Sequence, residues 1–526
     1  MLRVSGCWWM EVIRSWIERF ECRARRSLGA GGKNEERRVK NEECLAGRSL
    51  GIGGRSEKLK VKSEDEEARK HKMRKANSQM PAANINDPSN ISYKSTGNGR
   101  SYIVPFILVT SLFFLWGLAN SLNGTLIKHF QTALHLSRAQ AGIVDSAFYI
   151  GYFVMAIPAG FLLNRVGYKK GILIGLLLYA TGAILFYPAA EVRMYAFFLM
   201  ALFIIACGLA FLETAANPYV TVLGSPRWAE VRINFSQFFN GLSTIFAPVI
   251  GSIFIFSSTE YTNDLLNAMP ADQAEAIRIA EAHSVQMPYL ALAGIVLFVA
   301  ILFSLVHMPE ISDASETHAS MKGIFKHKHL VAGIIAQFFY VGAQASIWGY
   351  FIDIKLHFAA NDHLEIVKFF YRITDDMTPT QIASYHASFG FILFMLGRFV
   401  GTGLLTFFRA ERLLSAYAII CFSLLVFAWT GEGILSVVAI LAVYFFISIM
   451  FPTIFALSIK NLGSQVKLGS SLVIMAIAGG AVLPPLTGLV SQTGMQNALI
   501  VPAVAFLFIL YFGVRGYKLD VEGSGS

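Results

Sequence analysis

The sequence predicts an all-α polytopic membrane protein with twelve transmembrane helices in two pseudo-symmetric six-helix bundles. Apolar residues make up 55% of the 526 residues and charged residues 15%, with a mean hydropathy of +0.53. Soluble domains usually carry about 25% charged residues. From Tyr102 onward the apolar residues fall into blocks roughly twenty residues long, the length of helix that crosses a bilayer. These observations exclude an ordinary secreted or cytosolic enzyme.

Twelve apolar blocks follow Tyr102, and a polar stretch separates the first six from the last six. The predicted spans are 102–122, 141–163, 170–188, 194–222, 233–256, 288–307, 330–352, 382–407, 412–429, 435–457, 468–490 and 497–515. The strings that begin at Gly160 and Asn217 have weak counterparts six spans later, at Gly403 and Phe451. Parallel repeats of this kind are typical of transporters that hold their substrate between two halves, near the bilayer midplane.

The domain organisation follows from these blocks. We predict an N-terminal bundle at 101–307, a cytoplasmic linker at 308–329 and a C-terminal bundle at 330–518, followed by a short tail at 519–526.

Residues 1–100 read as a different kind of segment. They hold 22 of the 44 Lys and Arg but only 13 of the 34 Asp and Glu, so the net charge of +10 belongs mostly to this leader. RSLG occurs twice in the segment, as does KNEE, and such charged, Gly-containing repetition does not bury enough apolar surface to fold. We expect a disordered leader, either an artefactual upstream extension of the reading frame or a cytoplasmic tail. The nearly neutral remainder gives no reason to expect a nucleic-acid partner.

The loops predict the orientation. With the N-terminus inside, the cytoplasmic loops and the C-terminus carry fourteen Lys and Arg, against seven in the external loops. Basic residues gather on the cytoplasmic side of membrane proteins. Both termini are therefore expected in the cytoplasm.

Two carboxylates fall inside predicted spans, where a charge is costly and usually serves function. Glu213 lies well within the fourth span, where a proton-exchanging carboxyl that also binds a hydroxyl is one interpretation and a structural carboxylate is the other. Asp145 lies about one turn into the second span, so a helix-start carboxylate favoured by the helix dipole is the alternative there.

Amide and aromatic side chains in the first, fourth, fifth and seventh spans suit a neutral polyhydroxy ligand. Several of them share a helix face because they are three or four residues apart. For each amide, a hydrogen bond between helices without a ligand is the alternative. The candidate substrate-binding residues are Asn120, Asn123, Glu213, Asn217, Gln237, Asn240, Gln344 and Trp348.

A polar turn between the second and third spans is expected to serve in gating and not in substrate contact. Its residues are Asn164, Arg165, Gly167, Lys169 and Lys170. The sequence contains no Walker loop, zinc-ligand spacing, Ser/His/Asp arrangement or dinucleotide fingerprint, so we expect neither an ATP-driven pump nor an enzyme, and no metal.

Several strings from about Arg100 to Lys518 resemble the fucose:proton symporter family of the major facilitator superfamily. They are SYIVPF, SLFFLWGLANSLN, SAFYIGYF, LFIIACGLAFLETAANPYVTVLG, YVGAQ, SAYAII, PTIFALSIKNLG and KLGSSLVIM. The resemblance implies the major facilitator fold. It also implies that Glu213, Gln237 and Asn240 bind sugar and take part in coupling. The family's second proton-linked carboxylate, an aspartate of the first span, is replaced here by Gly124.

The resemblance therefore implies a proton-coupled secondary transporter for a monosaccharide, with L-fucose the first choice. It would reside in the bacterial inner membrane as a monomer, use the proton gradient as its energy source and need no cofactor. Coupling would rest on Glu213 alone or on Glu213 with Asp145. The alternatives are a glucose, galactose or other hexose symporter, a facilitator of the same family, and a sugar sensor that does not transport.

Overall fold

The computed structural model describes residues 103–133, 138–250, 269–309, 321–360, 362–374 and 377–518, and the regular secondary structure in these ranges is entirely helical. Ten segments among them are long and apolar enough to cross a membrane. One of these, Ala147–Val192, is 46 residues long and is broken at Gly167, and α7 adds a further helix of 22 residues. With the 46-residue segment counted as two spans and α7 as one more, the described residues contain the twelve expected spans.

Six helices make up the described part of the first half of the chain. Their bounds are α4 (Ile103–Ala133), α5 (Arg138–Val192), α6 (Tyr195–Val222), α7 (Ala229–Ile250), α9 (Ala271–Ser284) and α10 (Gln286–Leu305). The helix α5 holds two spans, because Gly167 takes a φ of 80° that glycine tolerates and most residues do not. The predicted limits of these spans agree with the helices to within a few residues, except that α4 continues past 122. The predicted leader, residues 1–100, lies outside the described residues.

The second half repeats the pattern, with several spans built from two shorter helices. Its helices are α11 (Met321–Ile324), α12 (Lys328–Ala359), α13 (Glu365–Tyr371), α14 (Pro379–Leu404), α15 (Ala410–Thr430), α16 (Gly433–Ile447), α17 (Met450–Ser458), α18 (Val466–Met475), α19 (Gly479–Ser491) and α20 (Ile500–Tyr511). The tenth span breaks between α16 and α17, and the eleventh between α18 and α19 at the short turn Ala476–Ala478. The predicted tail, 519–526, is not among the described residues.

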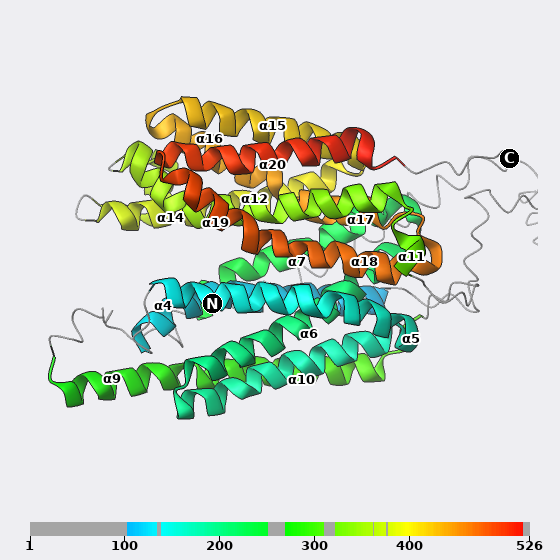
Figure 1. The fold of residues 1–526 in the computed structure, drawn as a ribbon, viewed down its shortest axis with the longest axis horizontal. Helices are drawn as coiled ribbons and strands as arrows, with labels where there is room; N and C mark the ends of the chain where they lie inside the picture. The colour runs from blue at the N-terminus through cyan, green and yellow to red at the C-terminus, as the bar shows by residue number, and fades with distance from the viewer. Residues whose placement is uncertain are drawn as a thin grey trace, which may run out of the picture. The chain divides into compact units, whose positions relative to one another are not determined.

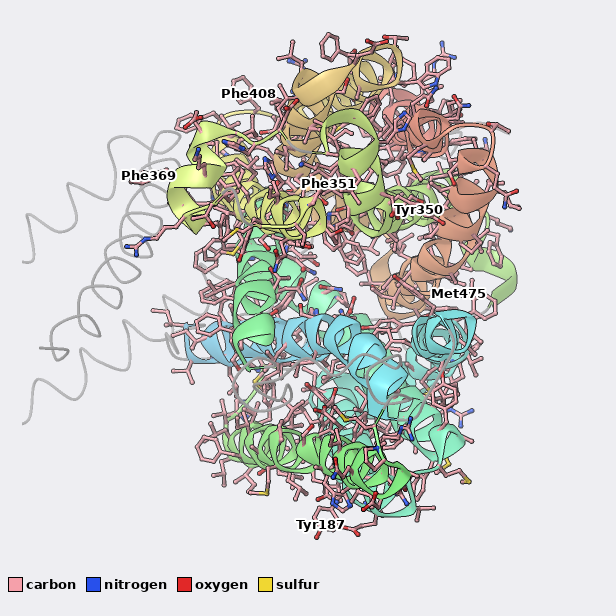
Figure 2. The ribbon with its side chains drawn as sticks, turned by 90° about the vertical axis from the view of Figure 1, so that its left-hand side faces the viewer. Tyr187, Tyr350, Phe351, Phe369, Phe408 and Met475 are labelled. Carbon is pink, nitrogen blue, oxygen red and sulfur yellow. The ribbon has the colours of Figure 1, made fainter. Side chains whose placement is uncertain are left out.

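The helices run roughly side by side in two groups (Figure 1). Helices α4, α5, α6 and α10 pack against one another, as do α12, α15, α19 and α20. The groups meet where α7 packs against α14 and α17, and where α5 packs against α18. In the end-on view of Figure 2, Phe369 and Phe408 lie at the periphery, with 81% and 57% of their surfaces exposed. Exposed aromatic side chains of this kind suit contact with lipid.

One end of the helix array carries most of the basic loop residues, and we call it the basic end. Lys169, Arg227, Lys326, Arg409 and Lys460 define it. The opposite end carries α9.

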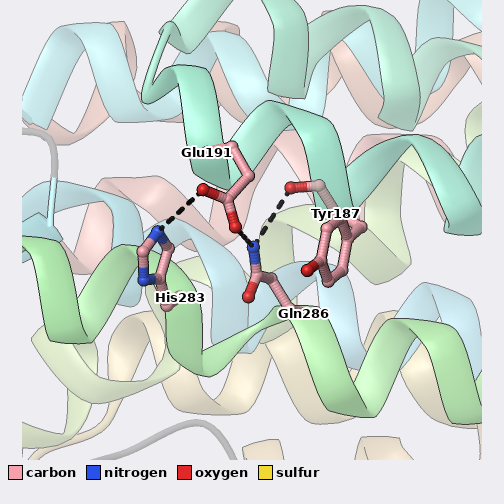
Figure 3. Close-up of polar contacts among 4 residues, drawn as sticks. All are labelled: Tyr187, Glu191, His283 and Gln286. Atoms are coloured by element: carbon pink, nitrogen blue, oxygen red, sulfur yellow. Dashed lines mark hydrogen bonds and ion pairs between the residues drawn. The ribbon is translucent and has the colours of Figure 1, made fainter.

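A small polar cluster fastens α9 and α10 to the end of α5 (Figure 3). The Gln286 side-chain amide donates to Glu191 Oε1 at 2.9 Å and to the Tyr187 carbonyl oxygen at 3.2 Å. His283 Nε2 lies 3.8 Å from Glu191 Oε2. The cluster lies where α9 meets α10, so it holds the turn between these helices against α5.

Glycines allow the helices of each half to approach backbone to backbone. A Cβ atom at Gly479 in α19 would collide with the Phe338 carbonyl of α12, and one at Gly397 in α14 with the Phe445 carbonyl of α16. Small residues at helix crossings are a common means of packing inside membranes, where the hydrophobic effect does not drive helices together.

This packing predicts that Gly479→Ala destabilises the protein, because the new methyl group meets backbone that cannot rotate away. We expect a loss of about 1–3 kcal/mol in the free energy of unfolding, the usual cost of overpacking. Gly294→Ala is the matched control, since Gly294 lies in α10 with open space around its Cα. Thermal unfolding in detergent compares the two variants, and equal melting temperatures would contradict the prediction.

Candidate functional site

Glu213 lies near the middle of α6, in a helix that is buried over most of its length. Only 4% of its surface is exposed, and the Tyr152 hydroxyl of α5 donates a hydrogen bond of 2.7 Å to its Oε1. A buried carboxyl group needs such a partner, because an unmet charge or dipole is costly away from water. The structure thus places the predicted carboxyl inside the protein, paired with a phenol.

The next turn of α6 continues this polar cluster. Asn217 is fully buried one turn after Glu213, and its Oδ1 accepts a hydrogen bond of 3.4 Å from the Gln237 side chain of α7. Gln237 is 3% exposed. Among the described residues the Asn217 side-chain nitrogen has no hydrogen-bond partner, so this donor can bind a ligand oxygen or a water molecule.

Two further predicted amides lie on the helices that flank this cluster. Asn120 of α4 is exposed and lies within hydrogen-bonding reach of the Tyr152 hydroxyl. Asn240 of α7 is partly buried against α4, where a Cβ atom at Gly117 would come within 2.7 Å of its side-chain nitrogen. Amide, phenol and carboxyl groups from α4, α5, α6 and α7 therefore gather in the first half of the chain.

The second half contributes an aromatic cluster around Trp348 of α12. The rings of Phe391 and Phe394, both on α14, lie 5.0 Å and 5.4 Å from the Trp348 ring, and Tyr444 of α16 lies 6.3 Å away. Trp348 is partly exposed, and its buried Nε1 finds no hydrogen-bond partner in the part of the chain that the structure describes. Gln344, one turn earlier on α12, is partly buried. The site candidates thus divide into a polar group in the first half and an aromatic group in the second.

The predicted gating turn lies at the basic end. Lys169 donates from Nζ to the carbonyl oxygens of Ser304 and Val306, both at 2.9 Å, so it ties the turn in α5 to the end of α10. Gly167 supplies the break, and no described residue accepts a hydrogen bond from the buried side-chain nitrogen of Asn164. Arg165 and Lys170 are exposed.

Contacts between the two halves are found at the same end. Glu230 at the start of α7 lies 3.8 Å from Lys460, and the Asn234 side-chain nitrogen lies 3.3 Å from Thr453 Oγ1 of α17. The Lys467 ammonium lies over the Tyr168 ring at 5.0 Å. The basic end is therefore joined across the halves in this structure.

The side chains of three positions from the sequence analysis lie outside the described residues. Asn123 and Gly124 lie in α4, and Asp145 lies in the first turns of α5. The side chains of 123–133 and 138–146 fall outside the described residues, so the suggested proton relay at Asp145 remains a prediction.

The sequence analysis overlooked two residues of this region. Tyr152 stands in the string SAFYIGYF, but nothing in the sequence marked its hydroxyl as the partner of Glu213. Arg398 lies inside the predicted eighth span and is 3% exposed. Of the 22 basic residues after position 100, it alone was assigned to no loop, and that was a usable signal.

Within the described ranges, no group of three His, Cys, Asp or Glu side chains is placed to hold a metal ion. The two described cysteines, Cys207 and Cys421, are free and buried, as small apolar residues are.

Comparison with known proteins identifies the family. The sequence pattern of the Major Facilitator Superfamily matches residues 109–483. The chain is 40% identical over 432 residues to the L-fucose-proton symporter of Escherichia coli K12, an alignment that covers 80% of this chain and 94% of that protein. It is 34% identical over 433 residues to the glucose/galactose transporter of Brucella abortus, covering 82% and 98% of the two chains.

Solved structures agree. The fold superposes with a TM-score of 0.71 on a crystal structure of the Major Facilitator Superfamily transporter FucP in the outward conformation, at 40% identity over 79% of this chain and 99% of that one. A crystal structure of an Escherichia coli fucose:proton symporter variant gives a TM-score of 0.70 at 39% identity. The predicted family and fold class are confirmed.

The Tyr152–Glu213 hydrogen bond can be tested by a mutant cycle. Tyr152→Phe should cost about 1.5–3 kcal/mol of unfolding free energy in the wild type, the range for a bond to a charged group, and almost nothing when Glu213 is already leucine. Tyr179→Phe is the control, because the Tyr179 hydroxyl donates to the Leu115 carbonyl and should cost the same in both backgrounds. Chemical unfolding in detergent measures all six proteins. Equal costs of Tyr152→Phe in the two backgrounds would show that the bond adds nothing.

Proposed function

The chain belongs to the Major Facilitator Superfamily, and we propose that it is a secondary transporter that carries a monosaccharide together with protons. The observation that carries this proposal is the buried polar cluster of Tyr152, Glu213, Asn217 and Gln237. It places a titratable carboxyl one helical turn from amides of the type that binds sugar hydroxyls.

The cluster supports coupling because a single group, Glu213, can interact with both transported species, the sugar and the proton. A carboxyl group exists in a protonated and a charged form, and in either form it can hydrogen-bond to a sugar hydroxyl, so Glu213 can interact with both the sugar and the proton. A sugar hydroxyl that bonds to Glu213, or displaces Tyr152 from it, changes the balance between its two forms. Binding of the sugar and binding of the proton are then linked by one coupling free energy, which acts equally in both directions.

L-fucose is the first choice of sugar. Support comes from the 40% identity with the Escherichia coli L-fucose-proton symporter and from the Glu213, Gln237 and Asn240 positions. The aromatic cluster at Trp348 supplies apolar ring faces that can pack against a sugar ring. Glucose or galactose is the second candidate, favoured by the 34% identity with the Brucella transporter.

Alternating access supplies the mechanism. The bundles at 101–307 and 330–518 would rock against each other around the site, and the linker at 308–329 would connect them. In a bacterial inner membrane, the basic end and both termini would face the cytoplasm. Contacts such as Glu230–Lys460 then close the cytoplasmic side. This assignment agrees with the superposition on an outward conformation. The turn with Asn164, Arg165, Gly167, Lys169 and Lys170 would help hold that side shut, and a monomer would suffice.

Uptake by the purified protein in liposomes tests the function. Labelled L-fucose should accumulate above equilibrium when protons flow inward, and a protonophore should abolish the accumulation. Labelled D-glucose and D-galactose, tested in the same way, identify the preferred sugar. Equal uptake with and without the gradient would show a facilitator, and lack of uptake of all three labelled sugars would contradict the proposal.

Glu213→Gln should abolish proton-driven accumulation and leave sugar exchange measurable. Glutamine preserves an oxygen that accepts the Tyr152 hydroxyl but does not titrate, so binding survives while coupling is lost. Counterflow and gradient-driven uptake, measured on the same liposomes, separate the two functions. Glu191→Gln is the control, because Glu191 is an exposed carboxylate of the cluster at the far end of α5. Normal accumulation by Glu213→Gln would exclude Glu213 from coupling.

A second hypothesis concerns the missing family aspartate. Gly124 has no side chain to relay protons from outside, and Asp145 is predicted at the same external end on the neighbouring helix. Asp145→Asn should then lower gradient-driven accumulation more than it lowers sugar exchange, and Gly124→Asp should restore part of the loss. An unchanged pH dependence of transport by Asp145→Asn would make it a helix-start carboxylate only.

A further inference from the structure

Arg398 carries a buried positive charge that the sugar and proton cluster does not use. It lies in α14 with 3% of its surface exposed, and the described residues offer it no acidic partner within ion-pair distance. Its Nε donates to the Ser448 carbonyl oxygen at 2.9 Å, and its Nη1 donates to the Gln237 carbonyl oxygen. The guanidinium also lies 4.5 Å from the centre of the Phe394 ring. Two backbone carbonyls and a π face thus replace the usual counter-ion.

The first acceptor belongs to the same half as Arg398. Ser448 follows directly after α16, where the tenth span is broken before α17 begins at Met450. Carbonyls at the end of a helix lack partners within the helix and carry partial negative charge. This break therefore offers a fixed acceptor for a cation, and Arg398 remains bound to its own half through it.

The second acceptor belongs to the other half. Gln237 lies on α7, and its side chain donates to Asn217 next to Glu213. Arg398 of the eighth span thereby fixes the backbone of Gln237, a candidate sugar-binding residue in the fifth span. The same α7 makes the Glu230–Lys460 and Asn234–Thr453 contacts, so Arg398 acts beside the other contacts that join the halves at the basic end.

We propose that Arg398 is a latch between the two halves: it holds the basic end closed and keeps Gln237 in position, and it releases the Gln237 carbonyl when that end opens. The inference rests on the proposed alternating-access transport. Opening separates α7 from α14 and α17, so the Gln237 bond must break. The Ser448 bond and the Phe394 contact lie within one half and persist. Water that enters with the opening replaces the lost carbonyl, so the charge is never left without a partner.

Lysine tests the latch because it keeps the charge but lacks the planar fork that reaches two carbonyls in different directions. Spin labels at Arg227→Cys and Asn461→Cys, exposed loop positions of the two halves at the basic end, report its opening in a background free of the five native cysteines. Distances are measured in nanodiscs without sugar. Arg398→Lys and Arg398→Met should both shift the distribution toward longer distances. Arg412→Lys, an exposed basic residue at the same end, is the control and should not shift it.

A second readout separates positioning from general stability. Because Gln237 is less fixed in Arg398→Lys, the KM for sugar exchange should rise roughly tenfold, the loss of about one hydrogen bond, while the maximal exchange rate falls less. Wild-type distances and KM together with a lowered melting temperature would show that Arg398 is only structural and would overturn the latch. The distances do not depend on any sugar. A failure of proton-driven uptake in the wild type would therefore count against the proposed function and not against the latch.

Discussion

A carboxyl group placed deep inside a membrane-spanning helix must find its hydrogen-bond partners within the protein, because hydrocarbon supplies none. For Glu213 the partner is Tyr152, so a polar contact sets how α5 lies against α6. One turn further along α6, the buried Asn217 also needs a partner within the protein, and the Gln237 side chain of α7 supplies it. The arrangement of three helices thus follows from one ionisable group that is kept away from water. The remaining helices pack around this core by size and shape.

Hydropathy alone predicted most of the fold. The apolar blocks agreed with most spans to within a few residues, although α4 and α12 continue beyond the predicted limits. Gly167 marked the turn inside α5 because a polar, glycine-containing string lies between two apolar runs. The break inside the tenth span was not foreseen, since Ser448 and Ile449 continue a mostly apolar block without an interruption. A one-dimensional pattern carries little information about such a break.

The site was predictable in its ionisable and amide groups but not in their partners. Glu213 and Gln237 stand out because polar groups are rare inside spans, whereas Tyr152 counts as an ordinary membrane residue until its hydroxyl is seen to face a carboxyl group. Arg398 is different. Its charge was visible in the sequence, but the candidate site residues were chosen among carboxyl, amide and aromatic side chains. Which carbonyls it reaches depends on how two halves of the chain meet, and no local pattern encodes that.

Glycines allow close helix crossings within each half and also between the halves. Gly479 and Gly397 face the backbone of a neighbouring helix, but Gly160 faces the Ser471 side chain across the halves, and Gly480 faces the Tyr149 ring. At Gly479 and Gly397 the facing atoms are backbone, which moves less readily than the side chains that face Gly160 and Gly480. A larger residue at Gly160 or Gly480 would therefore act on how the two halves meet, and a larger residue at Gly479 or Gly397 on the packing inside one half.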